Sequence, residues 1–456
     1  MLVYFDAPGV WWNRGINLLR SLPEAQVVSA DGEWDLKVSV QVRNDAMLLS
    51  AEDRKSKQTA IIPATRQDYL RGLFSLLERL LGQSPSPWGI LTGVRPGKVA
   101  AKLLSSHGRE ETIDTLKAQY LLAPGKAQLV TSAVENGQQV LQPRGVSIYI
   151  SVPFCPSRCN YCSFPGYIRH NWRHLLADYI DAVARELSDL LTGCAMYQLP
   201  VNSIYVGGGT PTSLSAGQLE QMLTPVSDYR GEFTIEAGRP DTLAPEFFSV
   251  MEQLGVTRVS INSQFPNQHT LDAIGRRHSV EEFYNVLELA LNANIPVVNT
   301  DLIIGLPGQS PELFVSVLDQ FIGLGVQNIT LHALALKRGA KLSAQYLDQE
   351  TAVSIAEAAY ARLNESGYGP YYLYRQKNIA ANLENIGFSL PGHYCYYNIA
   401  SIAESEPVLG VGAGAVSKLV RHNSIETLNN PRDPKLYLER NQDLVRRKLD
   451  WLRHSS

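Results

Sequence analysis

The stretch Cys155-Pro156-Ser157-Arg158-Cys159-Asn160-Tyr161-Cys162 holds three of the five cysteines of the chain, spaced C-x3-C-x2-C. Thiolates are the usual ligands of iron–sulfur clusters, and a cubane cluster normally takes four of them. A cluster held by this run alone leaves one iron without a protein ligand. The apolar run 148–152 just upstream predicts a strand. The cysteine loop is therefore expected at the carboxyl end of a strand, where α/β proteins build their sites.

The cysteine trio also allows three alternative interpretations, which stay open. A structural zinc site needs four tight ligands, usually from two C-x2-C pairs, although His170 could serve as a fourth. A disulfide cluster fits poorly with so few cysteines in a long chain of cytosolic character. The spacing could also arise by chance. Under the cluster interpretation, the open iron can bind the amino and carboxylate groups of S-adenosylmethionine (SAM).

The composition limits the class of protein. The 456 residues are 45% apolar and 19% charged, which is enough for two or three domains with real cores. Lysine and arginine total 41 against 44 acidic residues, and this balance argues against a general nucleic-acid binder. The first residues lack the pattern of a signal peptide, and no run of 18 apolar residues predicts a membrane span. We expect a soluble, cytoplasmic α/β protein.

The chain is predicted to have four parts. Residues 1–83 indicate a small α+β accessory domain, with short strands at 2–5, 25–28, 36–42, 47–50 and 59–62 and an amphipathic helix at 66–81. Residues 84–146 form a helical linker region, in which Arg95 and Lys98 either hold an anion or simply start a solvated helix. Residues 147–335 form the central domain, and residues 336–456 form a region that covers the substrate.

In the central domain, strand and helix patterns alternate six times. Strands are predicted at 147–152, 203–206, 232–235, 258–262, 297–304 and 328–331. Helices are predicted at 174–191, 216–226, 245–254, 280–292 and 311–324, and two more at 351–366 and 435–452 in the last region. Six β-then-α units predict a parallel sheet that forms a partly closed barrel.

Polar groups lie within or just after the predicted strands. The glycines in 207–211 expose backbone groups that suit the amino group of SAM. Glu236 could accept from a cationic or hydroxyl group of SAM, and Arg276, twelve residues after Gln264, could grip its carboxylate. Asp301 is either a structural carboxylate or a ligand of the ribose, and the convergence of these groups on one barrel end favours the ligand.

Two further features have simpler interpretations. The segment 410–415 loosely fits G-x-G-x-x-A, but no βαβ unit follows it, so a dinucleotide fold is not expected. Cys194 and Cys395 are isolated, and isolated thiols are most often buried and inert. A redox or ligand role for Cys395 stays open.

Together these motifs resemble the radical SAM family, and more narrowly its oxygen-independent coproporphyrinogen III oxidase group. The run Tyr149-Ile150-Ser151-Val152-Pro153-Phe154-Cys155 resembles the strand that leads into the cluster in that group. Gly93-Val94-Arg95-Pro96, Tyr374-Arg375-Gln376-Lys377-Asn378 and Asn382-Leu383-Glu384-Asn385-Ile386-Gly387 are similar to its HemZ-like subgroup.

The resemblance implies a [4Fe-4S] cluster on Cys155, Cys159 and Cys162, a partial (β/α)6 barrel, and one SAM with room for a second. The residues that match the SAM positions are Tyr149, Tyr161, Gly208, Gly209, Thr210, Glu236, Gln264, Arg276 and Asp301. It also implies a low-potential electron donor and an anionic tetrapyrrole, which needs cationic partners. The candidates are Arg375, Lys377, Lys337 and Arg338.

The implied reaction is the oxidative decarboxylation of two propionates of coproporphyrinogen III, which gives protoporphyrinogen IX in haem biosynthesis. One position departs from the family, because Phe164 stands where its dehydrogenases have a fourth cysteine. A haem-binding or trafficking protein is therefore an alternative, with His393, His332 or Cys395 as candidate axial ligands. A radical SAM enzyme acting on another substrate is a third hypothesis, and the oligomeric state stays open.

Overall fold

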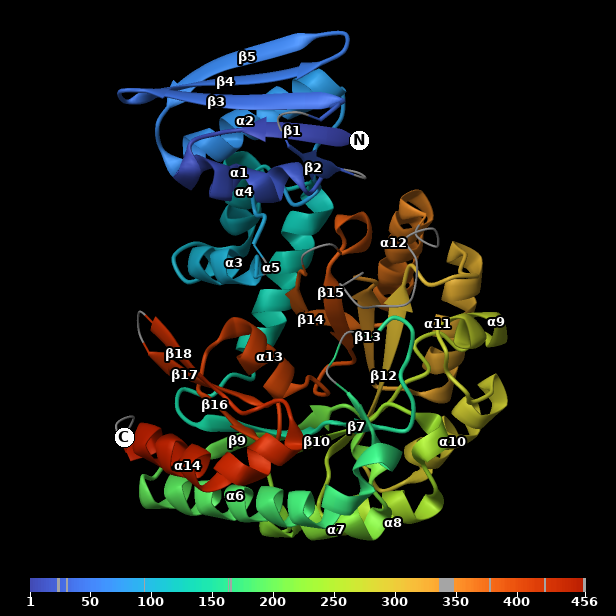
Figure 1. Ribbon diagram of the computed structural model, residues 1–456. Coiled ribbons are helices and arrows are strands. Elements are labelled where there is room, and N and C mark those ends of the chain that lie inside the picture. The colour runs from blue at the N-terminus through green and yellow to red at the C-terminus, as the bar shows by residue number, and fades with distance from the viewer. Residues whose placement is uncertain are drawn as a thin grey trace. The chain divides into compact units, whose positions relative to one another are not determined.

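The computed structural model describes residues 1–22, 25–29, 32–93, 95–162, 164, 166–335, 348–376, 379–421 and 424–453. The chain divides into two compact units (Figure 1). The first comprises residues 1–135 and 374–384, and the second comprises residues 136–373 and 385–456. No helix in the described part of the chain is both long enough and apolar enough to cross a membrane.

The first unit is built on a five-stranded sheet with the order β2-β1-β3-β4-β5. Its strands are β1 (Leu2–Asp6), β2 (Gln26–Val28), β3 (Leu36–Arg43), β4 (Ala46–Asp53) and β5 (Lys57–Pro63). Its helices are α1 (Gly9–Leu19), α2 (Arg66–Leu81), α3 (Gly97–Leu104), α4 (Arg109–Tyr120) and most of α5 (Pro124–Gln138). The five predicted strands and the predicted helix at 66–81 are confirmed within a few residues.

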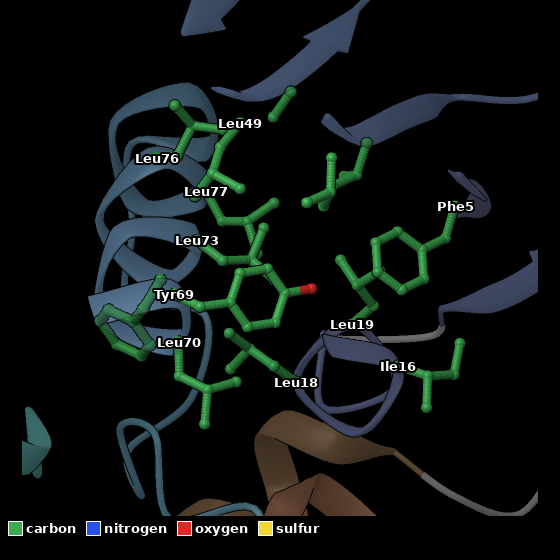
Figure 2. Close-up of a cluster of buried hydrophobic side chains, with 14 of the residues drawn as sticks. Phe5, Ile16, Leu18, Leu19, Leu49, Tyr69, Leu70, Leu73, Leu76 and Leu77 are labelled. Atoms are coloured by element: carbon green, nitrogen blue, oxygen red, sulfur yellow. The ribbon is translucent and has the colours of Figure 1, made fainter. Parts of the chain in front are cut away.

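The core of this unit lies between α1, α2 and the sheet (Figure 2). Leu73, Leu76 and Leu77 on α2 are fully buried, as the apolar stripe of the sequence predicts. The Thr65 hydroxyl caps the start of α2 by accepting from Asp68 N, and Gly82 ends it with φ +68°. The Tyr69 hydroxyl points into the cluster and donates to the Trp11 carbonyl at 3.1 Å.

The second unit is built on an eleven-stranded sheet with the order β14-β15-β13-β12-β11-β10-β9-β6-β16-β17-β18. Six strands in its middle run parallel and lie side by side in chain order. They are β6 (Val146–Val152), β9 (Val201–Gly208), β10 (Glu232–Ala237), β11 (Arg258–Ile261), β12 (Val297–Ile304) and β13 (Asn328–Ala333). The order is linear, so the sheet does not close on itself, as the partly closed barrel predicts.

Helices follow these strands, and the sequence predicts all of them except the short helix at 268–273. They are α6 (Leu176–Met196), α7 (Ala216–Leu223), α8 (Pro245–Gln253), α9 (Gln268–Ala273), α10 (Val280–Asn292) and α11 (Pro311–Leu324). Ser215 and Ser279 each form a capping box, and Ser310 caps α11 ahead of Pro311. Helix α7 is shorter than predicted because Pro225 follows in a 3-10 turn.

The last region of the chain extends the sheet at both edges. Strand β15 (Asn385–Ser389) runs antiparallel to β13, and β14 (Gly369–Tyr374) lies beside it. On the other side, β16 (Val408–Val411) runs parallel to β6, and β17 (Val416–Arg421) and β18 (Ser424–Asn429) follow it. The helices of this region are α12 (Gln349–Glu365), α13 (Tyr396–Ala403) and α14 (Pro434–Arg453). The sequence predicted α12 and α14 but none of these five strands.

A buried ion pair joins α14 to α6 beneath β16. Glu186 on α6 and Lys448 on α14 are both fully buried and form a salt bridge. Lys448 Nζ also donates to the Gly410 carbonyl at 2.5 Å, and Glu186 Oε2 accepts from Gly412 N at 3.1 Å. The glycine segment 410–415, which loosely fits a dinucleotide fingerprint, is thus the end of β16 and the tightly held turn after it.

Candidate functional site

The cysteine loop leaves the carboxyl end of β6, as predicted. Cys155 ends the short strand β7 (Phe154–Cys155), which pairs with β8 (Tyr167–Ile168). All five cysteines lie in the described residues and are free thiols, so the disulfide interpretation of the trio is wrong. Asn160 ties the loop to the end of α9, because its backbone N–H donates to Ile274 O and its amide to Ala273 O, both at 2.9 Å.

The cysteine loop offers three thiols as donors. Among the residues that the structure describes, no three His, Cys, Asp or Glu side chains are arranged to bind one metal ion. A cubane places each thiolate on a different iron, so its ligands need not converge on one point. Cys159 is buried and the other two thiols are half-buried. Burial raises the pKa of the Cys155 and Cys162 thiols, and ligation to iron would deprotonate them.

The glycine segment after β9 packs directly against the cysteine loop. Gly209 N donates to the Val152 carbonyl at 2.7 Å, and Thr210 N donates to the Phe154 carbonyl at 2.8 Å. The Thr210 hydroxyl lies 3.6 Å from Cys155 Sγ as a donor. A Cβ at Gly209 would lie 2.6 Å from Phe154 O and 3.0 Å from Cys155 Sγ, so a side chain there would push the loop away.

Glu236 lies at the end of β10 beside a stack of tyrosines. Its carboxylate accepts from the Tyr205 hydroxyl at 2.6 Å. Burial raises its pKa to about 7, and the neighbouring Asp301 charge adds to this shift. The Tyr205 ring lies 4.5 Å from the Tyr397 ring and 6.2 Å from the Tyr149 ring. The sequence pointed to Glu236 and Tyr149 but carried no signal for the other two rings, which no motif contains.

Asp301 lies on β12 in a dense polar network. It accepts from the side-chain amides of Asn262 and Asn299 at 3.0 and 2.9 Å, and its carboxylate lies 3.8 Å from His332 Nε2 on β13. Burial raises the pKa of Asp301, but the hydrogen bond and charge of His332, together with hydrogen bonds from Asn299 and Thr330, lower it overall. The same pairing raises the pKa of His332 despite burial.

Arg276 bridges the strand ends and the cysteine loop. It is 6% exposed, and its Nη1 donates to the carbonyls of Gly238, at 2.8 Å, and Asn262, at 2.5 Å. Its Nη2 donates to the Tyr161 hydroxyl at 3.1 Å, while Nε is buried and has no partner among the described residues. Gln264 adopts φ +74° and its backbone pairs with β12. Both residues therefore lie at the predicted end of the sheet.

Of the four predicted substrate residues, the structure describes only Arg375. Arg375 belongs to the first unit, is 7% exposed, and lies over the Trp88 ring at 5.4 Å with Nη1 donating to Leu91 O. Burial lowers its pKa to about 10, and little of its guanidinium is open to a carboxylate. Lys337, Arg338 and Lys377 lie outside the described residues.

The two isolated cysteines are buried. Burial raises the pKa of Cys194 to about 11, and burial together with Glu232 raises the pKa of Cys395 to about 12. The Cys395 thiol donates to Glu232 Oε1 at 3.6 Å. Both thiols are therefore protonated near neutral pH, as expected of inert cysteines. Phe164, at the position of the missing family cysteine, is 63% exposed.

The sequence reasoning missed Arg239, which follows β10. Its Nη1 donates to Cys159 Sγ at 3.7 Å, and the residue is only 3% exposed. An arginine in a short polar loop has no distinguishing sequence signal, and only the fold brings this one to the cysteine loop.

Comparison with known proteins agrees with this geometry. The model of the Radical SAM superfamily matches residues 149–321, which run from the middle of β6 into α11. A three-cysteine loop on the first strand of an open six-fold β/α sheet is the arrangement of a radical SAM protein. The superfamily implies a [4Fe-4S] cluster and SAM as cofactors.

Individual relatives show which family within the radical SAM superfamily the chain belongs to. The chain is 37% identical over 384 residues to the oxygen-independent coproporphyrinogen-III oxidase-like protein HemZ of Bacillus subtilis, covering 80% of this chain and 77% of that protein. It therefore belongs to the oxygen-independent coproporphyrinogen III oxidase family, in the HemZ-like subgroup. It is also 31% identical over 279 residues to the heme chaperone HemW of Lactococcus lactis, covering 59% of this chain and 68% of that one.

A solved structure supports the fold. The coproporphyrinogen III oxidase HemN of Escherichia coli, described as a radical SAM enzyme, aligns with a TM-score of 0.53 at 20% identity. The alignment covers 68% of this chain and 73% of that one. At this identity the likeness shows the shared architecture alone.

Proposed function

We propose that this chain is a radical SAM oxidoreductase that oxidatively decarboxylates two propionates of coproporphyrinogen III to vinyl groups, giving protoporphyrinogen IX. The observation that carries the proposal is the likeness to HemZ over 80% of the chain, well beyond the barrel that all superfamily members share. The cysteine loop and the polar strand ends that converge beside it support the same chemistry.

The residues present suit the implied cofactors. Cys155, Cys159 and Cys162 would hold the cluster, and polar residues at the neighbouring strand ends would hold SAM. The SAM residues we propose are Tyr149, Tyr161, Gly208, Gly209, Thr210, Glu236, Gln264, Arg276 and Asp301. When bound, cluster and SAM supply one-electron cleavage of SAM and the hydrogen abstraction that follows.

The protein itself contributes binding, orientation and the exclusion of water. Gly208, at φ +106°, and Gly209 bring the backbone against the cysteine loop without side chains in between. Glu236 and Asp301 offer carboxylate oxygens among largely buried polar groups, where a hydrogen bond to a charged group is stronger than in water. The Arg276 Nε, buried and without a partner among the described residues, is a donor left over for a ligand.

The substrate carries four propionates, so it needs cationic partners. We retain Lys337, Arg338 and Lys377 as candidates. Arg375 is the weakest candidate, because its guanidinium is packed on Trp88 and bonded to Leu91. A low-potential electron donor and an electron acceptor are also required.

The test is an anaerobic turnover assay. The protein with reconstituted cluster is given SAM, a strong reductant and coproporphyrinogen III, and the products are followed by mass spectrometry. We expect the loss of two CO2 per porphyrinogen, with matching 5′-deoxyadenosine. C159A should abolish both products, whereas C194A removes a buried thiol of α6 and should retain them. Deoxyadenosine without a change in porphyrinogen would point to another substrate.

A second candidate function is haem binding or trafficking. Two observations favour it: the heme chaperone HemW is among the relatives, and Phe164 replaces the cysteine that the family dehydrogenases carry. It predicts a stable, stoichiometric haem complex and no porphyrinogen turnover by protein with an intact cluster. Absorption titration with haemin separates it from the first proposal. H393A should weaken the complex if His393 is an axial ligand, and H174A, at an exposed position just before α6, is the matched control.

A further inference from the structure

Arg239 makes three hydrogen bonds to the cysteine loop. Its Nη1 donates to Cys159 Sγ at 3.7 Å and to the Ser157 carbonyl at 3.4 Å. Its Nη2 donates to the Ser157 hydroxyl at 3.0 Å. Only 4% of the side chain is exposed, so a single buried guanidinium holds the middle of the loop and contacts one of its thiols.

Asp241 balances this charge. Its two carboxylate oxygens accept from Arg239 Nε at 2.9 Å and Nη2 at 2.8 Å. Every nitrogen of Arg239 therefore has a partner within the protein, and no donor remains for SAM or for a substrate carboxylate. His278 lies 3.9 Å from Asp241, and burial lowers its pKa to about 4, so it is neutral and adds no charge near pH 7.

We propose that Arg239 is a positioning residue that raises the reduction potential of the cluster bound at Cys159, and that Asp241 opposes it. The inference rests on the proposed cluster ligation. A cation and an N–H···S hydrogen bond both stabilise the more negative, reduced cluster, and hydrogen bonds to the sulfurs are a known lever on cluster potentials. The Asp241 carboxylate offsets part of that positive charge.

The experiment is a redox titration of the reconstituted protein followed by EPR, at pH 7.5 without SAM or porphyrinogen. We expect R239Q to have a more negative potential, with the ratio of reduced to oxidised cluster at a fixed solution potential falling about tenfold, or about 59 mV for one electron. D241N should shift the potential the opposite way, because it leaves the Arg239 charge unopposed. R239K should lie between R239Q and the wild type.

The matched control is R230Q, because Arg230 is an exposed arginine just before β10 whose contacts are with residues of its own turn. A purely structural role would move R239Q and D241N in the same direction, or would lose cluster in both without a shift, and either result overturns the inference. The iron and sulfide content shows whether R239Q keeps its cluster. If it does not, D241N alone tests the inference: a more positive potential supports it, and an unchanged or more negative potential overturns it.

This test does not depend on the substrate. Opposite shifts in R239Q and D241N support the inference even if coproporphyrinogen III is not decarboxylated. Equal potentials in all variants overturn it even if decarboxylation is found. Wild-type protein that takes up no cluster would overturn both proposals.

Discussion

Glu236 carries a carboxyl group that titrates near neutral pH, because burial raises its pKa to about 7. If the ionised form accepts from SAM, binding requires a pH above this value. Between pH 8 and pH 6 the ionised fraction falls about tenfold, and we expect the affinity for SAM to fall by a similar factor. Equilibrium binding of SAM to the reconstituted protein measures this.

In E236Q the affinity for SAM should be weaker and nearly independent of pH. In E220Q, which changes an exposed residue of α7, the affinity for SAM should depend on pH as in the wild type. A pH slope that survives in E236Q would assign the titration to another group.

His278 is fully buried, and its two ring nitrogens lack hydrogen-bond partners among the described residues. Burial lowers its pKa to about 4 from 6.5, so the folded state binds this proton more weakly than the unfolded state. The stability it contributes is present above pH 6.5 and is lost as pH falls towards 4. From pH 7 to pH 5 the unfolding free energy should fall by about 2 kcal/mol more in the wild type than in H278Q.

Urea unfolding at the two pH values measures this difference. H174Q changes an exposed histidine of the same unit, and its unfolding free energy should fall between pH 7 and pH 5 by as much as that of the wild type. Equal losses in the wild type and H278Q would contradict the prediction.

At the level of single residues, the sequence predicted those that belong to motifs. Cys155 follows β6, Glu236 lies near the end of β10 and Asp301 lies within β12, and all three belong to recognisable runs of the sequence. Arg239 and His332 gain their importance from contacts with residues far away in the chain. Such contacts are decided by strand register, which a single sequence does not display.

Among the elements, the link between α6 and α14 depends on the Glu186–Lys448 pair. Removing one partner of a buried pair leaves an uncompensated charge and costs about 3–5 kcal/mol. K448M should therefore lower the unfolding free energy by about this amount, while the double variant E186L/K448M should recover much of it. Denaturant unfolding of the four proteins of this cycle gives the coupling energy.

K435M, at the exposed start of α14, is the control and should change the unfolding free energy by less than about 0.5 kcal/mol. Additive losses in the double variant would show that the two charges do not interact.

Strands and helices with a clear hydrophobic pattern could be predicted from the sequence, and those without one could not. The six parallel strands are short apolar runs between capped helices, and all were predicted. Strand β18 was not, because five of its six side chains are exposed and its sequence looks like a polar loop. Helix α1 was missed because tryptophan, asparagine and glycine give it a weak helix propensity, and its contacts with β1 and α2 stabilise it instead.

In the whole molecule, each unit has a core of its own. Leu73 is fully buried in the core of the first unit, so L73A should lower the stability of that unit by about 2–5 kcal/mol through lost contacts and a cavity. Hydrogen exchange of β3 and β4 amides reports on this unit specifically. I61A, at a position that is 78% exposed on β5, should leave the exchange almost unchanged. Unchanged protection in L73A would show that this core does not limit opening.

The pairing of β6 with β16 has a consequence for the growing polypeptide. The strand that leads into the cysteine loop is complete at Val152, but its outer neighbour begins at Val408, roughly 250 residues later. At a translation rate of about 5–20 residues per second, that edge stays open for roughly 10–50 s on the ribosome. The Ser151 hydroxyl donates to the Ala413 carbonyl at 2.8 Å, and this hydrogen bond forms only after the same delay. The cysteine loop is therefore synthesised early and completed late. If it holds the proposed cluster, iron delivered to the nascent chain would reach an unfinished site.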